Sequence, residues 1–424
     1  MKNKHVLVCG LAKSGQAAIK LLLKHGAIAT AQDLKSDIKL ECDNIKLQLG
    51  QQPDITKQEL IIISPGISIY APFVQEAIKK NIPVWGEMEL AYRYCKSPIT
   101  AITGTNGKTT VTTVVGEMYK LVGESVTLGN IGVPFASIAD TIEPTTNIAL
   151  EVSSFQLETI CKFAPKISAI LNITPDHLDR HKNMETYIEM KSRIFSNQKK
   201  DDYCILNFDN IITRNTKPPC NAIFFSCKEK TDVYISDNYI IYNNQKIANI
   251  NDTILMQENA LAVTAIGIAA GIPFHIIKTA LENHKGVEHR LEYIANFNKV
   301  DYYNDSKATN VDSAIKALVN IKKPIILIAG GSDKYADFTP WVELFNEKVI
   351  QLILIGETAE KIADTCKKTG YNNFCFADSL KDAVDKAKNI AKPGQVVLLS
   401  PACASFDMFK NFEDRGKKFK ELIL

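Results

Sequence analysis

The sequence predicts an α/β protein built from three domains in series. Short apolar runs alternate with segments whose apolar residues recur at helical spacing, which is typical of doubly wound parallel sheets. The chain has 424 residues, enough for three domains at about 150 residues each. Ser97-Pro98 interrupts the chain before a new strand–loop–helix pattern begins, and a third stretch of alternation starts near Leu291.

Each third of the chain contributes its own elements. In the first third we expect strands at 5–10, 27–32, 60–63 and 82–84, and helices at 14–25 and 71–80. In the middle third we expect strands at 99–103, 147–152 and 167–173, helices at 109–121, 186–196, 260–270 and 273–283, and short β-like pieces within 201–252. In the last third we expect strands at 300–304, 325–329, 351–355, 373–377 and 396–400, with helices between them, for example at 358–369 and 379–391.

Composition excludes several classes of protein. Lys plus Arg (50) nearly balances Asp plus Glu (47), so a general nucleic-acid-binding surface is not expected. The longest largely apolar stretch, 260–274, is shorter than the roughly 20 residues of a membrane span. None of the ten cysteines forms a CxxC pair, which favours reduced thiols. We therefore expect a cytoplasmic protein that binds neither nucleic acid nor membrane.

The strongest local motif is TGTNGKTT at 103–110, between a predicted strand and a predicted helix. Such a loop directs backbone amides and a helix N-terminus at phosphate oxygens. Lys108 can reach the β- and γ-phosphates, and the Thr109 hydroxyl suits Mg²⁺. The loop is the short T-G-x-x-G-K-T form, with Ile102 where GxxxxGK[ST] has its first glycine. The expected ATP contacts in the loop are Gly104, Thr105, Asn106, Gly107, Lys108, Thr109 and Thr110.

Two further polar groups follow buried strands. Glu151 ends the strand 147–152, and His177 follows the strand 167–173. Ligands of open parallel sheets lie beyond the carboxyl ends of strands, so both side chains should lie at the same edge as Thr109. Glu151 fits the preference of Mg²⁺ for oxygen ligands, while His177 is a less usual ligand for this ion. A solvated strand-end acid and a hydrogen-bonded loop histidine are the simpler alternatives.

Several segments together resemble the Mur ligase family, ATP-dependent enzymes that form amide bonds in peptidoglycan precursor synthesis. They are TGTNGKTT (103–110), GNIGVP (129–134), EVSSFQLE (151–158), NITPDHLDRH (172–181), HR (289–290), NDSKATN (304–310), GGSDKYADF (330–338) and SPACASFDMFKNFEDRG (400–416). They cover nearly the whole chain. NDSKATN and the 400–416 segment resemble most closely the family members that add D-glutamate to UDP-N-acetylmuramoyl-L-alanine.

The resemblance implies three domains. These are an N-terminal Rossmann-like domain for the UDP-sugar at 1–92, a central P-loop ATPase-like α/β domain at 93–290, and a mobile C-terminal Rossmann-like domain for the amino acid at 291–424. It also implies ATP, two Mg²⁺ ions, an acyl-phosphate intermediate, and the small-molecule partners UDP-N-acetylmuramoyl-L-alanine and D-glutamate. We expect a monomer.

Matching residue by residue extends the expected site. Lys191 matches a lysine that family members carry as a carbamate, which would add a metal ligand to Thr109, Glu151 and His177. Lys108, Glu151, His177 and Lys191 are the expected catalytic residues. The resemblance adds Asn259, Arg290 and Asp305 for ATP, Ser14, Asp33, Asn130 and Ser153 for the UDP-sugar, and Thr309, Lys334, Ser405 and Phe412 for D-glutamate.

Several of these residues also have an ordinary structural explanation. Lys191 could be a solvated helix lysine, Arg290 a surface ion pair, and Asp305 a helix-entry acid. Thr309 with Asp312 resembles a helix-capping box. Ser405 and Phe412 could simply pack in a core.

Some features depart from the family pattern and leave rival functions open. The turn at 10–15 lacks the central glycine of GxGxxG, Leu34-Lys35 stands where relatives often have Thr-Arg, and Leu255 and Met256 occupy the positions of a frequent His-Asn pair. A sibling ligase, such as folylpolyglutamate synthase or a Mur ligase for another amino acid, is one alternative. A nucleotide switch that makes no bond is another, and a nicotinamide oxidoreductase built on the first domain is a third.

Overall fold

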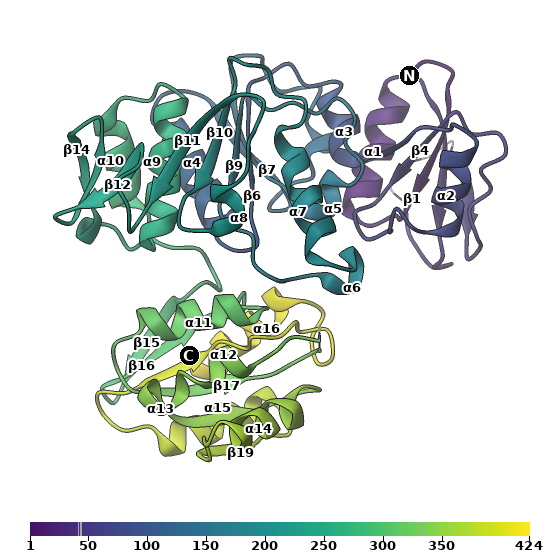
Figure 1. Cartoon of the computed structure of the whole chain (residues 1–424). Coiled ribbons are helices and arrows are strands. Elements are labelled where there is room, and N and C mark those ends of the chain that lie inside the picture. The colour runs from purple at the N-terminus through teal and green to yellow at the C-terminus, as the bar shows by residue number, and fades with distance from the viewer. Residues whose placement is uncertain (41, 43–44, 334) are drawn as a thin grey trace. The chain divides into compact units, whose positions relative to one another are not determined.

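The computed structural model describes residues 1–40, 42, 45–333 and 335–424. The chain forms two compact units, Met1–Lys285 and Gly286–Leu424. Unit 1 carries two sheets and unit 2 carries one, each covered by helices (Figure 1). The predicted α/β class is confirmed.

The first sheet of unit 1 is wholly parallel, with strand order β3-β2-β1-β4-β5. Its strands are β1 (His5–Cys9), β2 (Ile28–Asp33), β3 (Lys46–Leu49), β4 (Leu60–Ile63) and β5 (Val84–Gly86). Its helices are α1 (Lys13–Lys24), α2 (Pro72–Lys79) and α3 (Glu87–Tyr92). The order reverses at β1, so ligands are expected outside the carboxyl ends of β1 and its neighbours.

The second sheet of unit 1 has nine strands in the order β14-β13-β12-β11-β10-β9-β6-β8-β7. They are β6 (Ile99–Thr103), β7 (Ser125–Gly129), β8 (Asn147–Glu151), β9 (Ile167–Ile170), β10 (Tyr203–Asn207), β11 (Asn221–Ser226), β12 (Val233–Ser236), β13 (Tyr239–Tyr242) and β14 (Gln245–Asn249). The helices are α4 (Lys108–Lys120), α5 (Ser154–Leu157), α6 (Leu178–His181), α7 (Met184–Ser192), α8 (Ile211–Arg214), α9 (Gln257–Ala269) and α10 (Phe274–Asn283), with short 3-10 turns at Phe135–Ser137, Arg193–Phe195 and Ile250–Asp252. The β12–β13–β14 meander is antiparallel, while the strands from β7 to β12 are parallel.

One continuous hydrophobic core joins the two sheets of unit 1. It includes Leu22 of α1 and Leu90 of α3 together with Leu150 of β8 and Phe163. Helices α1 and α3 thus lie on the side of the first sheet that faces the second (Figure 1). The opposite face of the second sheet packs against α4, α9 and α10 in a separate core. Because apolar burial is shared, these two sheets form one compact unit.

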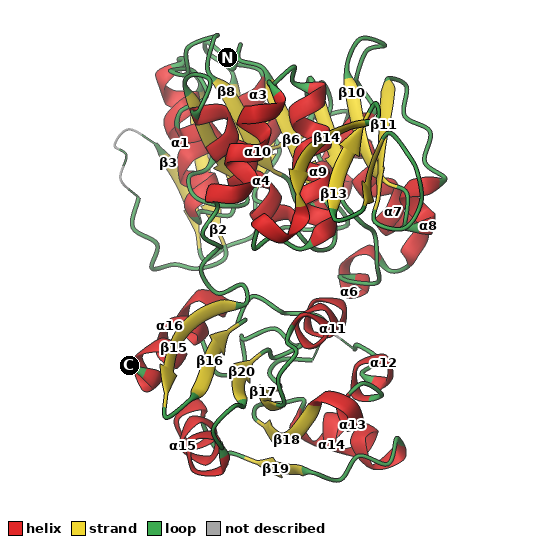
Figure 2. Ribbon diagram, turned by 90° about the vertical axis from the view of Figure 1, so that its left-hand side faces the viewer, coloured by secondary structure: helices red, strands yellow, loops and turns green. Residues whose placement is uncertain are grey.

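The sheet of unit 2 has the order β15-β16-β20-β17-β18-β19, and only β15 runs antiparallel to its neighbour (Figure 2). The strands are β15 (Glu292–Phe297), β16 (Val300–Asn304), β17 (Ile325–Ala329), β18 (Val349–Leu354), β19 (Phe374–Phe376) and β20 (Val396–Leu399). Helices α11 (Val311–Asn320), α12 (Thr339–Val342), α13 (Phe345–Lys348) and α14 (Ala359–Lys368) cover one face, and α15 (Leu380–Ile390) and α16 (Phe412–Ile423) cover the other. Trp341 and Phe345 are fully buried in the first of these layers.

The differences from the predicted elements concentrate at sheet edges. Strands β3, β7 and β15 were missed, and each is the outermost strand of its sheet. In the edge strand β3 only one of the four residues is buried, so the strand lacks the apolar run that marks a buried strand. The predicted strand 167–173 ends at Ile170, because the following residues turn to contact the loop after β6.

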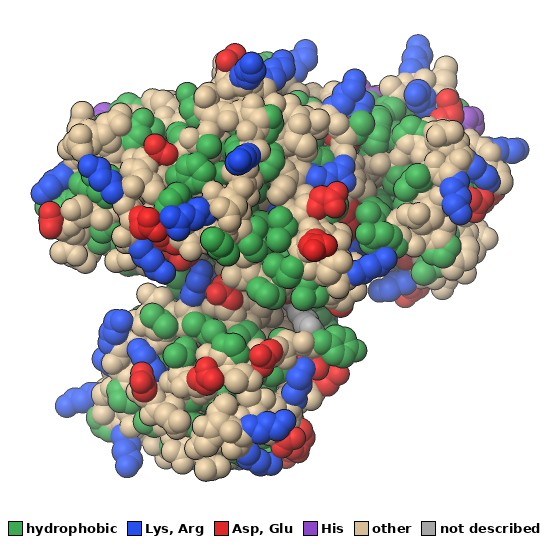
Figure 3. All heavy atoms as spheres, viewed as in Figure 1, with side chains coloured by type: hydrophobic (Ala, Val, Ile, Leu, Met, Phe, Trp, Pro, Cys, Tyr) green, Lys and Arg blue, Asp and Glu red, His purple; other side chains and the backbone are tan. Residues whose placement is uncertain are grey.

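Cationic and anionic side chains are interspersed on the face seen in Figure 3. Among the described residues, no helix combines the length and apolarity that crossing a membrane requires.

Candidate active site

The loop between β6 and α4 has the backbone of a phosphate-binding loop. Gly107 precedes α4 with φ of 85°, a left-handed conformation that glycine adopts readily. A Cβ at Gly107 would lie 2.6 Å from Oδ1 of Asn259, at the start of α9. The structure therefore brings the predicted Asn259 against the loop, and only glycine leaves room for this contact.

The loop is held from the other side by the segment after β9. The amide of Asn106 donates to Oδ1 of Asn172 at 2.8 Å, and the Asn172 side chain donates back to Asn106 O at 3.2 Å. The Thr105 amide donates to Asn172 O at 2.9 Å. Asn172 was not assigned a role from the sequence. Its signal was an amide side chain inside a predicted strand that is apolar apart from Ser168.

Thr109, Glu151 and Asn130 form a hydrogen-bonded group at the carboxyl ends of β6, β8 and β7. The Thr109 hydroxyl donates to Oε2 of Glu151 at 2.7 Å, and Asn130 Nδ2 donates to Oε1 at 3.0 Å. The Glu151 side chain is buried, whereas Thr109 is half-buried. A hydroxyl and a carboxylate in contact are the hard oxygen ligands that Mg²⁺ prefers, so this donor set fits the ion.

Two lysines converge on one carbonyl of the phosphate loop. Lys108 Nζ donates to Gly104 O at 2.9 Å and to Thr105 O at 2.8 Å. Lys191 Nζ, from α7, donates to the same Gly104 O at 2.8 Å. Burial, and then the charge of Lys108, hold the pKa of Lys191 well below its usual range, against the opposing pull of Asp176 and Glu151. The alternative that Lys191 is a solvated helix lysine is wrong, because the side chain is buried beside the loop.

His177 lies on the segment between β9 and α6. Its backbone is left-handed, with φ of 55°, and its ring meets Phe155 edge-on at 4.9 Å between centroids. Its Nε2 lies 3.6 Å from Oδ2 of Asp176. The same segment supplies Asn172 and Thr174 to the phosphate loop, which places His177 near this region of unit 1, but its role as a metal ligand stays a prediction.

The predicted UDP-sugar residues lie at strand ends and helix starts of unit 1. Asp33 ends β2 and accepts from the amides of Leu11 at 2.8 Å and Lys35 at 3.0 Å. Ser14 lies in the first turn of α1. Asp33 thus ties the Gly10–Gly15 turn to β2, and its contact with uracil stays a prediction.

Ser153 begins α5 and caps it. Its Oγ accepts from the Gln156 amide at 3.3 Å, and Gln156 Oε1 accepts from the Ser153 amide at 2.9 Å. This capping box fixes the turn directly after Glu151. The predicted contact of Ser153 with substrate is not tested by this geometry.

In unit 2 the structure brings Asp305 toward Arg290. Asp305 is buried and accepts from the Leu291 amide at 3.1 Å and the Ser400 hydroxyl at 2.9 Å. Burial raises its pKa to about 6, and Arg290 is the first of the groups that oppose this rise. The alternative of a solvated helix-entry acid is wrong, because burial and these donors enclose the carboxylate.

The predicted D-glutamate residues are only partly placed. Lys334 lies outside the described residues. Thr309 does not cap α11, contrary to the capping-box alternative; Asn310 is the cap, and its side chain accepts from the Ser313 amide at 2.9 Å. Asn310 has the extended backbone of a cap residue, whereas Thr309 lies one position too early.

Ser405 and Phe412 lie on the segment from β20 to α16. Ser405 is buried, and Phe412 is the first residue of α16. The Phe412 ring meets His289 at 6.3 Å between centroids and lies 5.0 Å from Lys307 Nζ. The Phe412 ring therefore packs against neighbouring side chains. Its contact with D-glutamate stays a prediction.

Arg415, also missed from the sequence, joins the two loops that carry Thr309 and Ser405. The fully buried guanidinium donates to Ser306 Oγ at 2.9 Å and Ser306 O at 2.8 Å. It also donates to Cys403 O and Ala404 O, both at 3.2 Å. The only sign of Arg415 in the sequence was its place as a charged residue in the FEDRG segment at 412–416.

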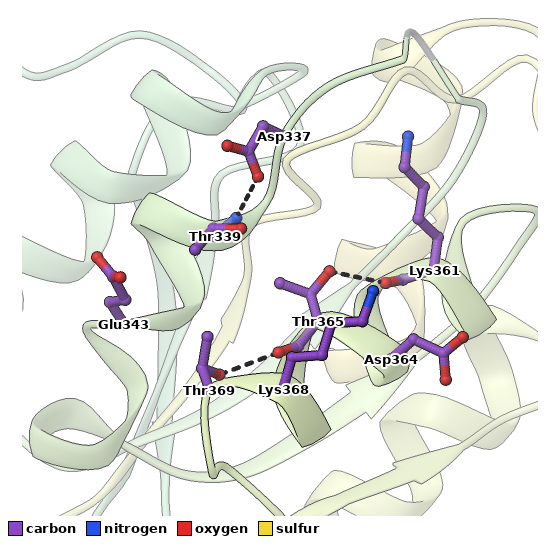
Figure 4. Close-up of a pocket in the computed structure, with 8 residues that line it drawn as sticks. All are labelled: Asp337, Thr339, Glu343, Lys361, Asp364, Thr365, Lys368 and Thr369. Atoms are coloured by element: carbon purple, nitrogen blue, oxygen red, sulfur yellow. Dashed lines mark hydrogen bonds between the residues drawn. The ribbon is translucent and has the colours of Figure 1, made fainter.

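Two other features of unit 2 do not behave as sites. A groove of about 660 Å³ is lined by Asp337, Thr339, Glu343, Lys361, Asp364, Thr365, Lys368 and Thr369. The Thr365 and Thr369 hydroxyls donate to nearby backbone carbonyls and the Asp337 carboxylate accepts from the Thr339 amide, as Figure 4 shows. No described residue predicted for D-glutamate lines the groove. Glu288, His289 and Glu292 resemble a metal cluster, but Lys420 Nζ already neutralises the two carboxylates at 3.0 and 2.6 Å.

Models of known protein families match segments in each third of the chain. Residues 4–86 match the family model "Mur ligase MurD-like, N-terminal domain", residues 102–268 match "Mur ligase middle domain", and residues 289–403 match "Mur ligase, glutamate ligase domain".

Curated relatives are similar over their full length. UDP-N-acetylmuramoylalanine–D-glutamate ligase of Caldanaerobacter subterraneus subsp. tengcongensis is 44% identical, over 100% of this chain and 99% of the relative. The enzyme of the same name from a Thermoanaerobacter species is 46% identical, over 100% and 98%.

Solved structures share the fold at lower identity. A pseudomurein peptide ligase type C of Methanothermus fervidus has a TM-score of 0.62 at 20% identity, over 99% of both chains. MurF ligase of Thermotoga maritima in complex with ADP has a TM-score of 0.62 at 16% identity, over 100% of this chain and 96% of that one. On the evidence of the three family models and the full-length relatives, this chain belongs to the Mur ligase family.

Proposed function

We propose that this chain is an ATP-dependent ligase that joins D-glutamate to UDP-N-acetylmuramoyl-L-alanine in peptidoglycan precursor synthesis. The observation that carries the assignment is full-length identity of 44–46% to relatives that bear this activity in their names. The hydrogen-bonded Thr109–Glu151 pair at the phosphate loop supplies the matching chemistry.

The reaction has two balanced steps. The alanyl carboxylate oxygen attacks the γ-phosphorus and ADP leaves, giving an acyl phosphate. The D-glutamate amine then attacks the acyl carbon, phosphate leaves, and the amine loses its proton. Bound ATP supplies the phosphoryl group, and Mg²⁺ offsets the charge on its oxygens.

The side chains around the loop can perform the supporting tasks. Thr109 and Glu151 would hold Mg²⁺ through the two oxygens that now contact each other. The ammonium of Lys108 now donates hydrogen bonds to the carbonyls of Gly104 and Thr105. When ATP is bound, it would donate to phosphate oxygens instead. Asn259 would keep the loop closed from the α9 side.

We further propose that Lys191 is carbamylated. The free amine, not the ammonium, reacts with CO₂ to give the carbamate and release a proton. Burial lowers the pKa of Lys191, which increases the amine fraction at neutral pH. The resulting anion would replace a buried cation beside Lys108 and add an oxygen ligand for a second Mg²⁺.

Two wider properties complete the proposal. The first is that the enzyme is monomeric, which we propose. All ten cysteines are free thiols, which supports a reducing, cytoplasmic location. Light scattering at working concentration tests the first of these.

A phosphate-release panel tests the activity. UDP-N-acetylmuramoyl-L-alanine with ATP is offered D-glutamate, L-glutamate, L-lysine or diaminopimelate in turn. We expect substantial release only with D-glutamate. Release with another amino acid would indicate a sibling ligase, and release without any acceptor would indicate a nucleotide switch. Hydroxylamine in place of the amino acid should trap a hydroxamate from the acyl phosphate.

A further inference from the structure

Arg180 is held in one orientation by a buried carboxylate. It lies in α6, three positions after His177. Its Nε donates to Oε1 of Glu158 at 3.0 Å, and its Nη2 donates to Oε2 at 2.6 Å. The guanidinium also lies 4.2 Å above the Phe155 ring. A two-point pair with a side chain that is only 2% exposed fixes the plane of the guanidinium.

The remaining donors of Arg180 reach the other sheet of unit 1. Nη1 donates to Pro65 O at 2.8 Å, and Nη2 donates to Ile67 O at 2.9 Å. Both carbonyls belong to the loop that follows β4 of the first sheet. One side chain therefore joins the segment that carries His177 to a loop 113–115 residues earlier in the chain.

That loop lies against the turn predicted to receive the UDP-sugar. The Ser64 amide donates to Cys9 O at 2.9 Å, at the end of β1. A Cβ on Gly10 would lie 2.7 Å from Cβ of Ser64, so the loop and the Gly10–Gly15 turn are in close contact. Asp33, at the end of β2, holds the same turn through the Leu11 amide.

Stability alone gives little reason for a charged bridge at this place. The two sheets already share a hydrophobic core, and a buried ion pair often adds no more stability than apolar side chains of the same size would. What the bridge does supply is a fixed distance between two loops. Phosphoryl transfer requires the acceptor carboxylate and the phosphorus within roughly 3–3.5 Å of each other, in line.

We propose that Arg180 is a positioning residue that sets the UDP-sugar substrate against the phosphate-transfer site, by holding the 64–67 loop at a fixed distance from the His177 segment. This inference rests on the proposed ligase function. Glu158 takes part by orienting the guanidinium, and neither residue need touch the reacting atoms.

The first test is Arg180→Lys in the full-length chain. A lysine keeps the charge, but its single ammonium cannot bind Glu158 at two points and reach both carbonyls. We expect KM for UDP-N-acetylmuramoyl-L-alanine to rise about tenfold, because charged hydrogen bonds to the loop are lost. We expect kcat/KM for this substrate to fall on the order of 10²-fold, as for a misplaced reactant. KM for ATP should stay within about twofold of wild type, since the phosphate loop is not bonded to Arg180.

Arg214→Lys is the matched control. Arg214 also lies over a phenylalanine ring, Phe208 at 3.9 Å, and also pairs with a glutamate, Glu229 at 3.3 Å. Its partners lie within the second sheet and its loops, so it bridges nothing to the 64–67 loop. We expect this variant to leave both KM values unchanged.

Glu158→Gln is a second, milder variant. Together with Arg180→Lys and the variant that carries both changes, it forms a double-mutant cycle. If the pair acts as one clamp, adding Glu158→Gln to Arg180→Lys should raise KM for the UDP-sugar little further. Calorimetric binding of UDP-N-acetylmuramoyl-L-alanine without ATP gives a reading that does not depend on turnover. It should weaken in step with KM.

Each outcome is decisive. A selective loss of affinity for the UDP-sugar supports the positioning role. If Arg180→Lys does not fold, the same loss in Glu158→Gln supports it. Unchanged kinetics, an equal change for ATP and UDP-sugar, or failure of both single variants to fold would overturn it and leave a purely structural pair. If the wild-type chain itself released no phosphate with both substrates, the proposed function would fail instead.

Discussion

Burial sets the chemistry of Lys191. Its ammonium would lie beside Lys108 with Gly104 O as a neutral acceptor, so the folded chain disfavours the charged form. An unfolded lysine has a pKa of about 10.4. At pH values below the pKa of Lys191 in the folded chain, the shift lowers the free energy of unfolding by its full amount. As pH rises from there toward 10.4 this loss shrinks, because the unfolded chain binds more protons than the folded one.

Lys191→Met should therefore make the folded chain more stable while damaging function. In CO₂-free buffer without nucleotide, we expect the free energy of unfolding at pH 7 to rise by about 1–4 kcal/mol, the range for replacing buried charges with apolar groups. The advantage should shrink as pH approaches 10. Urea unfolding at several pH values measures both effects. The exposed Lys200→Met serves as control, and a pH response identical in wild type and Lys191→Met would contradict the assignment.

The same variant tests the carbamate directly. With ¹³C-bicarbonate, wild type should show a carbamate resonance that Lys191→Met lacks. Turnover should fall on the order of 10²-fold, as when a charge-stabilising group is removed, while ADP binding changes little. A carbamate signal that persists in Lys191→Met would assign the modification to another lysine.

At the scale of elements, caps and loop ends decide where functional side chains lie. The α11 helix begins at Val311 because Asn310 caps it, which leaves Thr309 just outside the helix. The residue that caps α11, Asn310, is thus the direct neighbour of Thr309, which is predicted to contact D-glutamate. The sequence offered Thr309 as a cap only as the alternative to its predicted contact with D-glutamate, because Thr309-x-x-Asp312 resembles a capping box.

Asn310→Ala and Thr309→Ala should separate these roles. Loss of the Asn310 cap should lower the stability of unit 2 by about 1 kcal/mol, with little effect on KM for D-glutamate. Thr309→Ala should leave stability nearly unchanged and raise KM for D-glutamate. Denaturant unfolding and steady-state kinetics on both variants provide the comparison, and the reverse pattern would reject the assignment of Thr309.

At the scale of the molecule, stability is divided between two units. The shared core makes the first two sheets one unit, whereas the sheet of unit 2 has its own cores on both faces. The chain has two tryptophans, Trp85 in unit 1 and the fully buried Trp341 in unit 2. Each unit therefore contains its own fluorescent reporter.

Arg415→Leu should destabilise unit 2 selectively. It leaves the carbonyls of Ser306, Cys403 and Ala404 without this donor, at about 1–3 kcal/mol for each group that stays unsatisfied. In a Trp85→Phe background, Trp341 fluorescence should report an unfolding transition shifted by about 3 kcal/mol or more. Lys417→Leu, an exposed change on the same helix, should not shift it. An equal shift in unit 1, followed by Trp85 in a Trp341→Phe background, would show that the units do not unfold separately.

Local sequence patterns were enough to predict the α/β class, most buried strands and the phosphate loop. These features depend on residues close together in the chain: apolar runs of strand length, and a glycine, lysine and threonine within one loop. It also identified Thr109 and Glu151 by a rule for strand ends, and the structure brings them into contact. The edge strands β3, β7 and β15 escaped prediction because partly exposed residues carry little apolar signal.

Contacts between groups far apart in the chain could be seen only in the folded structure. Lys191 reaches Gly104 across 87 positions, and Arg180 reaches Pro65 across 115. Neither contact follows from the pattern around each residue, because a long arginine or lysine looks the same in sequence whether it is solvated or enclosed. Burial, orientation and the pKa that follows from them are properties of the packed chain, and they arise only where segments far apart in sequence exclude water together.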